Sequence, residues 1–125
     1  MKYVLGFVAA LVFAATAIAQ HVHGSQKGPN GGQMEDVAGV HAELLTSGST
    51  ITINVFDEGG KPLSTKAYTG SALVVSGSNR ETVSLIPSGV SALKGEAKNP
   101  IAAGASITLL IKTDIGKTGQ ARFRK

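Results

Sequence analysis

Short segments in which apolar and polar residues alternate constrain the fold of this chain more than any other feature. Ile51, Ile53 and Val55 alternate with Thr52 and Asn54. A period of two places the apolar side chains on one face of a β-strand and the polar ones on the other. The same pattern recurs at 40–44, 82–85, 107–111 and 121–124. It is typical of antiparallel strands with one buried and one solvated face.

Turn-forming residues separate these segments at short intervals. Ser47–Ser49, Ser76–Asn79 and Asp114–Lys117 have the composition of tight hairpin turns, and Asp57–Pro62 that of a longer reversal. Only Pro87–Ala92 is compatible with a helical turn. About seven short strands with such connections predict an all-β fold, an antiparallel β-sandwich of the immunoglobulin-like or cupredoxin-like kind.

We expect this sandwich to occupy residues 33–125 as one domain, because a chain of this length buries a single core. The chain has no cysteine, so the packing of the sheets must supply its stability without disulfides. The predicted core consists of Leu44, Ile53, Val55, Val74, Val83, Leu85, Ile107, Leu109, Ile111 and Phe123.

The N-terminal residues have the pattern of a secretory signal peptide. Met1-Lys2 gives a positive start, Val4–Ala15 is apolar, and Ala17-Ile18-Ala19 matches the small-residue cleavage motif. The apolar stretch is shorter than the roughly 20 residues that span a bilayer. Residues 1–19 therefore predict export and cleavage, giving a periplasmic or secreted product without stable membrane insertion. Residues 20–32 offer almost nothing to bury and predict a flexible N-terminal arm.

Several function classes find no support in the sequence. The net charge is +4, the lysine and arginine residues are scattered apart from Arg122, Arg124 and Lys125, and tryptophan is absent. This composition argues against nucleic acid as a partner. No G-x-S-x-G elbow, cysteine nucleophile or phosphate-binding glycine loop is present. Glu35 and Asp36 would point to opposite sides of a strand and so form no acid–base pair. The chain is predicted not to be an enzyme.

Candidate metal ligands cluster near the start of the expected product. They are His21 and His23 in the arm, Met34, and His41 with Glu43. On a strand, His41 and Glu43 would share the face opposite Ala42 and Leu44. Imidazole suits Cu(II) and Zn(II), and a thioether favours Cu(I). These residues predict a copper or zinc site. The alternative is that the arm is only a polar tail, that His41 is an ordinary surface residue of a strand, and that Met34 packs at the edge of the sandwich.

Two stretches resemble a known family. Gly31-Gly32-Gln33-Met34 followed by Val40-His41-Ala42-Glu43-Leu44 is similar to the opening of small periplasmic domains linked to heavy-metal efflux. Such domains occur alone or at the N-terminus of copper and cobalt-zinc-cadmium efflux adaptor proteins. The resemblance extends to Phe123 and implies a β-sandwich that binds a transition metal through His41 and Glu43. The chain lacks the coiled-coil hairpin and the lipoyl-like and barrel segments of a full adaptor, so it would be an accessory.

Two functions from different classes are therefore expected. The first is a periplasmic transition-metal-binding accessory of an efflux or resistance system, with an efflux component as partner. The second is a metal-free module that binds another envelope protein, with the arm as a spacer.

Overall fold

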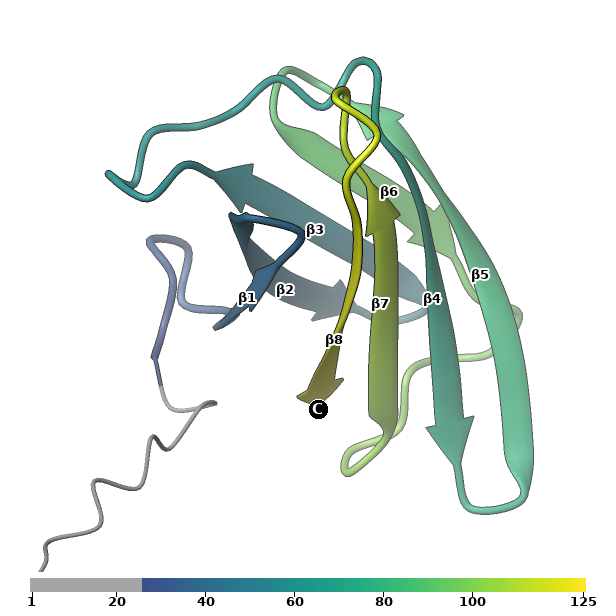
Figure 1. Cartoon of the computed structure of the whole chain (residues 1–125). Helices are drawn as coiled ribbons and strands as arrows, with labels where there is room; N and C mark the ends of the chain where they lie inside the picture. Colours follow the sequence, from purple (N-terminus) through teal and green to yellow (C-terminus); the bar gives the residue numbers. More distant parts are fainter. Residues whose placement is uncertain (1–25) are drawn as a thin grey trace, which may run out of the picture.

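The computed structural model describes residues 26–125, which form eight strands and no helix (Figure 1). The expected signal peptide and the first part of the arm lie outside these residues. The strands are β1 (Gln33–Val37), β2 (Val40–Ser47), β3 (Thr50–Phe56), β4 (Thr69–Ser76), β5 (Asn79–Ser88), β6 (Ala92–Glu96), β7 (Ser106–Lys112) and β8 (Thr118–Arg124). The prediction of an all-β fold is confirmed.

All neighbouring strands pair antiparallel, in the order β1-β2-β3-β6-β5-β4-β7-β8. The long strand β5 joins two halves of this sheet, because Asn79–Leu85 pair with β4 and Ile86–Ser88 pair with β6. The sheet wraps round until β1 and β8 meet, which nearly closes it into a barrel (Figure 1). The result is broadly sandwich-like, with two halves that face each other across the core.

Pro87–Ala92, whose sequence is compatible with a helical turn, contains the end of β5 and the reversal into β6. Pro87 is tolerated there because β4 pairs with β5 only as far as Leu85. One side of β5 is therefore free of ladder hydrogen bonds at the proline, which has no N–H to donate. No helix within residues 26–125 is long and apolar enough to cross a membrane.

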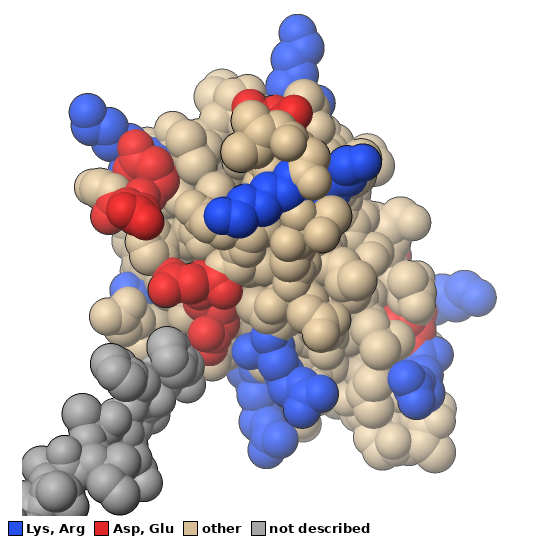
Figure 2. Space-filling view, in the orientation of Figure 1, with Lys and Arg blue, Asp and Glu red and all other residues tan. Residues whose placement is uncertain are grey.

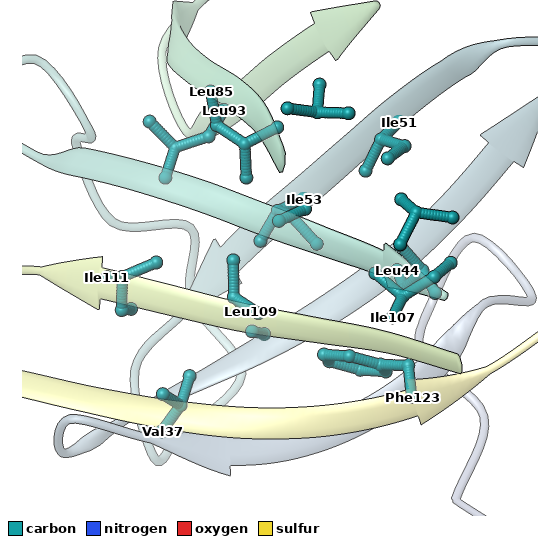
Figure 3. Close-up of a cluster of buried hydrophobic side chains, with 14 of the residues drawn as sticks. Val37, Leu44, Ile51, Ile53, Leu85, Leu93, Ile107, Leu109, Ile111 and Phe123 are labelled. Carbon is teal, nitrogen blue, oxygen red and sulfur yellow. The ribbon is translucent and has the colours of Figure 1, made fainter. Parts of the chain in front are cut away.

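The core lies between the two halves of the sheet (Figure 3). All ten residues predicted for it are buried. Ile53, Ile107 and Leu109 are completely inaccessible to solvent. The structure adds buried apolar side chains that were not among these ten. They are Val37, Val40, Ala42, Ile51, Phe56, Tyr68, Ala72, Leu93, Ala97, Ile101 and Ala105.

The seam between β1 and β8 closes through close packing. A Cβ atom placed on Gly119 would lie 2.7 Å from the main-chain nitrogen of Ala38. At the other end of the seam, the N–H of Arg124 donates to the side-chain oxygen of Gln33 over 3.2 Å. The absence of a side chain at Gly119 thus lets the β1–β2 turn rest directly on β8.

Residues 26–32, which belong to the expected flexible arm, form a hairpin with the start of β1. Lys27 bridges to Gln33, and the N–H of Met34 donates to the carbonyl of Gln26 over 2.9 Å. Two main-chain hydrogen bonds close the turn. The N–H of Gly31 donates to the carbonyl of Gly28, and the N–H of Gly28 donates to the carbonyl of Gly32. Pro29-Asn30-Gly31 supplies the residue types that such a turn needs, with Gly31 at a φ of 82°.

Candidate functional site

A two-residue turn sets which residues of β1 and β2 lie opposite each other. Ala38 and Gly39 have φ angles of 51° and 81°, the left-handed pair required by a type I′ turn. This turn pairs Asp36 with His41 and Met34 with Glu43. Residues paired in this way project from the same face, so all four lie on the side opposite Ala42 and Leu44.

The carboxylate of Asp36 contacts the imidazole of His41. Asp36 Oδ1 lies against His41 Nδ1, and the side chains are 73% and 28% exposed. An N–H on Nδ1 that donates to Asp36 leaves Nε2 with a lone pair that can bind a metal ion. The pair sits at the surface, so solutes can reach it.

Glu43 lies two residues further along β2 and is completely buried. Its Oε2 accepts hydrogen bonds from the N–H groups of Asn30 and Gly32, over 2.8 and 3.0 Å. Its Oε1 accepts from the side-chain amides of Asn30 and Asn54, over 2.8 and 3.4 Å. The 26–32 hairpin therefore covers the carboxylate, which binds four donors.

These contacts keep the buried carboxyl group ionised. Burial alone would raise the pKa of Glu43, but the donors from Asn30, Gly32 and Asn54 stabilise the anion. Together they outweigh burial and hold the pKa of Glu43 below its usual value. Glu43 thus acts within the fold as the acceptor that fastens the hairpin to β2.

The structure brings the proposed ligands together only in part. His41 contacts Asp36, and the oxygens of Glu43 are directed to the hairpin. Met34 is half-buried on β1 opposite Glu43, whereas His21 and His23 lie outside the described residues. In the part of the chain that the structure describes, no three histidine, aspartate or glutamate side chains gather into a group that could hold a metal ion.

Three residues of this region were not predicted from the sequence as part of a site, namely Asp36, Asn30 and Asn54. A signal for Asp36 was present, because a two-residue Ala-Gly turn between Val37 and Val40 places position 36 opposite position 41. Asn30-Gly31 was a turn signal, but only the tertiary structure shows that this turn lies on Glu43.

Charge is unevenly distributed around the site. In Figure 2, acidic side chains gather on the side of the molecule formed by β1 and its neighbours, and a basic group lies below the end of β8. Arg122, Arg124 and Lys125 stand at this end of the sequence. Asp36, which is 73% exposed beside His41, adds a negative charge at this surface that attracts cations.

Comparison of the chain with protein-family models, with curated proteins and with solved structures finds no match. The contacts of the described residues therefore carry the functional proposal.

Proposed function

We propose that this protein is an exported β-sandwich protein that binds a copper or zinc ion and serves as an accessory of a metal efflux or resistance system. The observation that carries the proposal is the contact between Asp36 and His41. Histidines that bind metals commonly donate their second ring N–H to a carboxylate, which fixes the tautomer and the ring orientation. Asp36 would do this for His41, whose Nε2 would be the metal ligand.

The remaining ligands of the proposed site come from residues near the start of the exported chain. His21 and His23 would supply further imidazole nitrogens and Met34 a thioether. Such a site leaves coordination positions open to water, so the metal would exchange readily, as suits transfer rather than storage. The resemblance to efflux-associated domains over Gly31–Leu44 supports the assignment to metal handling.

Export is part of the proposal, and its evidence is the pattern of residues 1–19. The intact mass of the protein recovered from its native compartment should correspond to a chain that begins at Gln20. An uncleaved protein that remains with the membrane fraction would contradict export.

Calorimetric titration with Cu(II) and Zn(II) tests the metal proposal on the chain that begins at Gln20. His41→Ala should abolish the high-affinity step, and Asp36→Asn should weaken it about 10–100-fold, the usual effect of losing the partner of a ligating histidine. Glu35→Gln is the matched control, because it removes the neighbouring charge without touching the Asp36–His41 contact. Equal losses in Asp36→Asn and Glu35→Gln would reduce the role of Asp36 to general electrostatic attraction.

The competing function is a metal-free module that binds another envelope protein. Val90 and Ile115, which are 78% and 82% exposed, lie on the β5–β6 and β7–β8 connections and offer apolar contact area for a partner. Absence of heat and of any shift in melting temperature with Cu(II), Zn(II), Ni(II) and Cu(I) would favour this module over the metal-binding accessory.

A further inference from the structure

We propose that the hollow at one end of the barrel, where the β1–β2 turn, the β7–β8 turn and residues 63–68 meet, binds a small amino acid with an apolar side chain. This end lies at the top of Figure 1, where the yellow β7–β8 turn stands beside the teal segment that leads into β4. The hollow has a volume of about 410 Å³. Ligand pockets usually measure roughly 300–1,000 Å³, and the mouths of barrels are among their common places. The inference goes beyond the proposed function, because none of the lining residues is a proposed metal ligand.

The hydroxyl of Tyr68 opens into this hollow without a partner from the fold. Tyr68 is only 5% exposed, and its side chain belongs to the core. Within residues 26–125 its hydroxyl makes no hydrogen bond, whereas every fully enclosed side-chain oxygen or nitrogen has one. The hydroxyl is therefore not enclosed, and the space it reaches is the hollow that Tyr68 lines. A few polar groups placed in an otherwise apolar pocket are what orients a bound ligand.

Two opposite charges line the same hollow, and in the described part of the chain they form no ion pair with each other. Asp114 and Lys117 are three residues apart on the β7–β8 turn, where the N–H of Thr113 donates to the carbonyl of Lys117 over 2.8 Å. The side chain of Lys117 extends over the β1–β2 turn, because its Nζ would lie 3.0 Å from a Cβ atom placed on Gly39. Both charges are thus available to a ligand.

The carboxylate of Asp114 acts together with Tyr68. Burial raises the pKa of Tyr68, and the nearby negative charge of Asp114 raises it further. The hydroxyl therefore stays neutral, and its oxygen can accept a hydrogen bond. A ligand ammonium group would donate to the Asp114 carboxylate and to the Tyr68 hydroxyl, while a ligand carboxylate would bind the ammonium group of Lys117.

Apolar side chains supply much of the remaining lining. Val40 is buried, Leu63 is half-buried, and Ile115 is 82% exposed at the tip of the β7–β8 turn. An apolar ligand side chain that packs here would remove Ile115 from water, which favours binding. An α-amino acid such as leucine carries an ammonium group, a carboxylate and an apolar side chain on one carbon. It therefore complements all three kinds of lining at once.

L-leucine and two molecules that each lack one of its charges serve as probes. Isopentylamine keeps the ammonium group and the apolar chain without the carboxylate, and isocaproate keeps the carboxylate without the ammonium group. Binding is measured by NMR titration of the backbone amide signals, on the metal-free chain that begins at Gln20. The variants Tyr68→Phe, Asp114→Asn and Lys117→Gln each remove one polar group of the hollow.

Glu58→Gln and Lys66→Gln are the matched controls, because each removes an exposed charge from the segment before β4 without lining the hollow. We expect L-leucine to shift the amide signal of Ile115 and to bind more tightly than either partial probe. The two controls should leave all three affinities unchanged.

The variants should separate the two ends of the ligand. Asp114→Asn and Tyr68→Phe should weaken binding of L-leucine and isopentylamine about tenfold or more, the usual effect of losing a hydrogen bond to a charged group. They should not weaken binding of isocaproate. Lys117→Gln should weaken binding of L-leucine and isocaproate to a similar extent and spare isopentylamine.

The melting temperature of Tyr68→Phe distinguishes a ligand-binding hydroxyl from a structural one. It should match that of the unsubstituted protein, because the hydroxyl has no partner to lose within the described fold. A marked fall would assign the hydroxyl a structural role and overturn the inference. Absence of amide shifts with all three probes, L-leucine binding no tighter than the partial probes, or equal losses in the controls would overturn it as well. These measurements use no metal ion, so their failure would leave the proposed function intact.

Discussion

Asn30 holds the buried carboxylate of Glu43 with two hydrogen bonds, one from its main-chain N–H and one from its side-chain amide, both 2.8 Å long. The two residues are 13 positions apart, and their contact fastens a turn that precedes β1 onto the outer face of β2. A buried polar group is stable in a fold only when its hydrogen bonds are satisfied. Glu43 meets this requirement with donors from the hairpin and from β3.

Removal of the negative charge at position 43 should destabilise the protein. Glu43→Gln should lower the free energy of unfolding by about 1.5–3 kcal/mol, the usual range for a hydrogen bond to a charged group. Chemical denaturation of the metal-free protein measures this change. Glu96→Gln, which alters an exposed carboxylate, should leave the denaturation midpoint nearly unchanged. Equal midpoints for the two variants would show that the hairpin contributes nothing to stability.

Stability should also depend on pH through Glu43. The pKa of Glu43 in the folded protein lies below that of the unfolded chain. Its contribution is therefore complete above the ordinary carboxyl pKa and is lost as the pH falls through the lowered folded value. Unfolding free energies measured from pH 7 down to pH 3 should fall less steeply for Glu43→Gln than for the unsubstituted protein. Parallel curves would mean that other groups account for the acid sensitivity.

The assignment of the two faces of β3 can be tested with neighbouring residues. Ile53→Ala should cost about 2–5 kcal/mol, because Ile53 is fully buried and its loss leaves a cavity. Thr52→Ala should cost little, since Thr52 lies on the opposite, partly exposed face. Thermal or chemical denaturation of both variants provides the comparison, and similar losses at the two positions would contradict the assigned faces.

Closure of the barrel should depend on Gly119. In Gly119→Ala the new methyl group would meet the main chain of Ala38, 2.7 Å from its nitrogen and 3.1 Å from its Cα. Neither atom can move without shifting the β1–β2 turn, so the substitution should cost about 1–3 kcal/mol, as for an overpacked core. Gly59→Ala is the control, because its nearest neighbour would be 3.4 Å away. Equal stability of the two variants would show that β1 and β8 do not pack as described.

The sequence by itself determined the fold class and the inner face of most strands. Alternation at Ile51, Ile53 and Val55 marks a half-buried strand without reference to the rest of the chain, because the period of two is a local property of extended backbone. Hairpin turns such as Ser47–Thr50 could also be predicted, since the conformation of a glycine-containing turn depends on only a few residues. β1 was harder to recognise, because Gln33–Val37 has little apolar alternation and is held by its partners.

Only the tertiary structure decided what the polar side chains on the outer face contact. From the sequence, His41 and Glu43 were equivalent neighbours on one strand face. In the fold they differ, because β1 brings Asp36 to His41 while the hairpin and β3 bring Asn30 and Asn54 to Glu43. Hydrogen-bond partners depend on register and on how distant segments pack, and local periodicity carries neither. The hydrophobic pattern therefore determined which face is buried, and long-range packing decided the partner of each polar group.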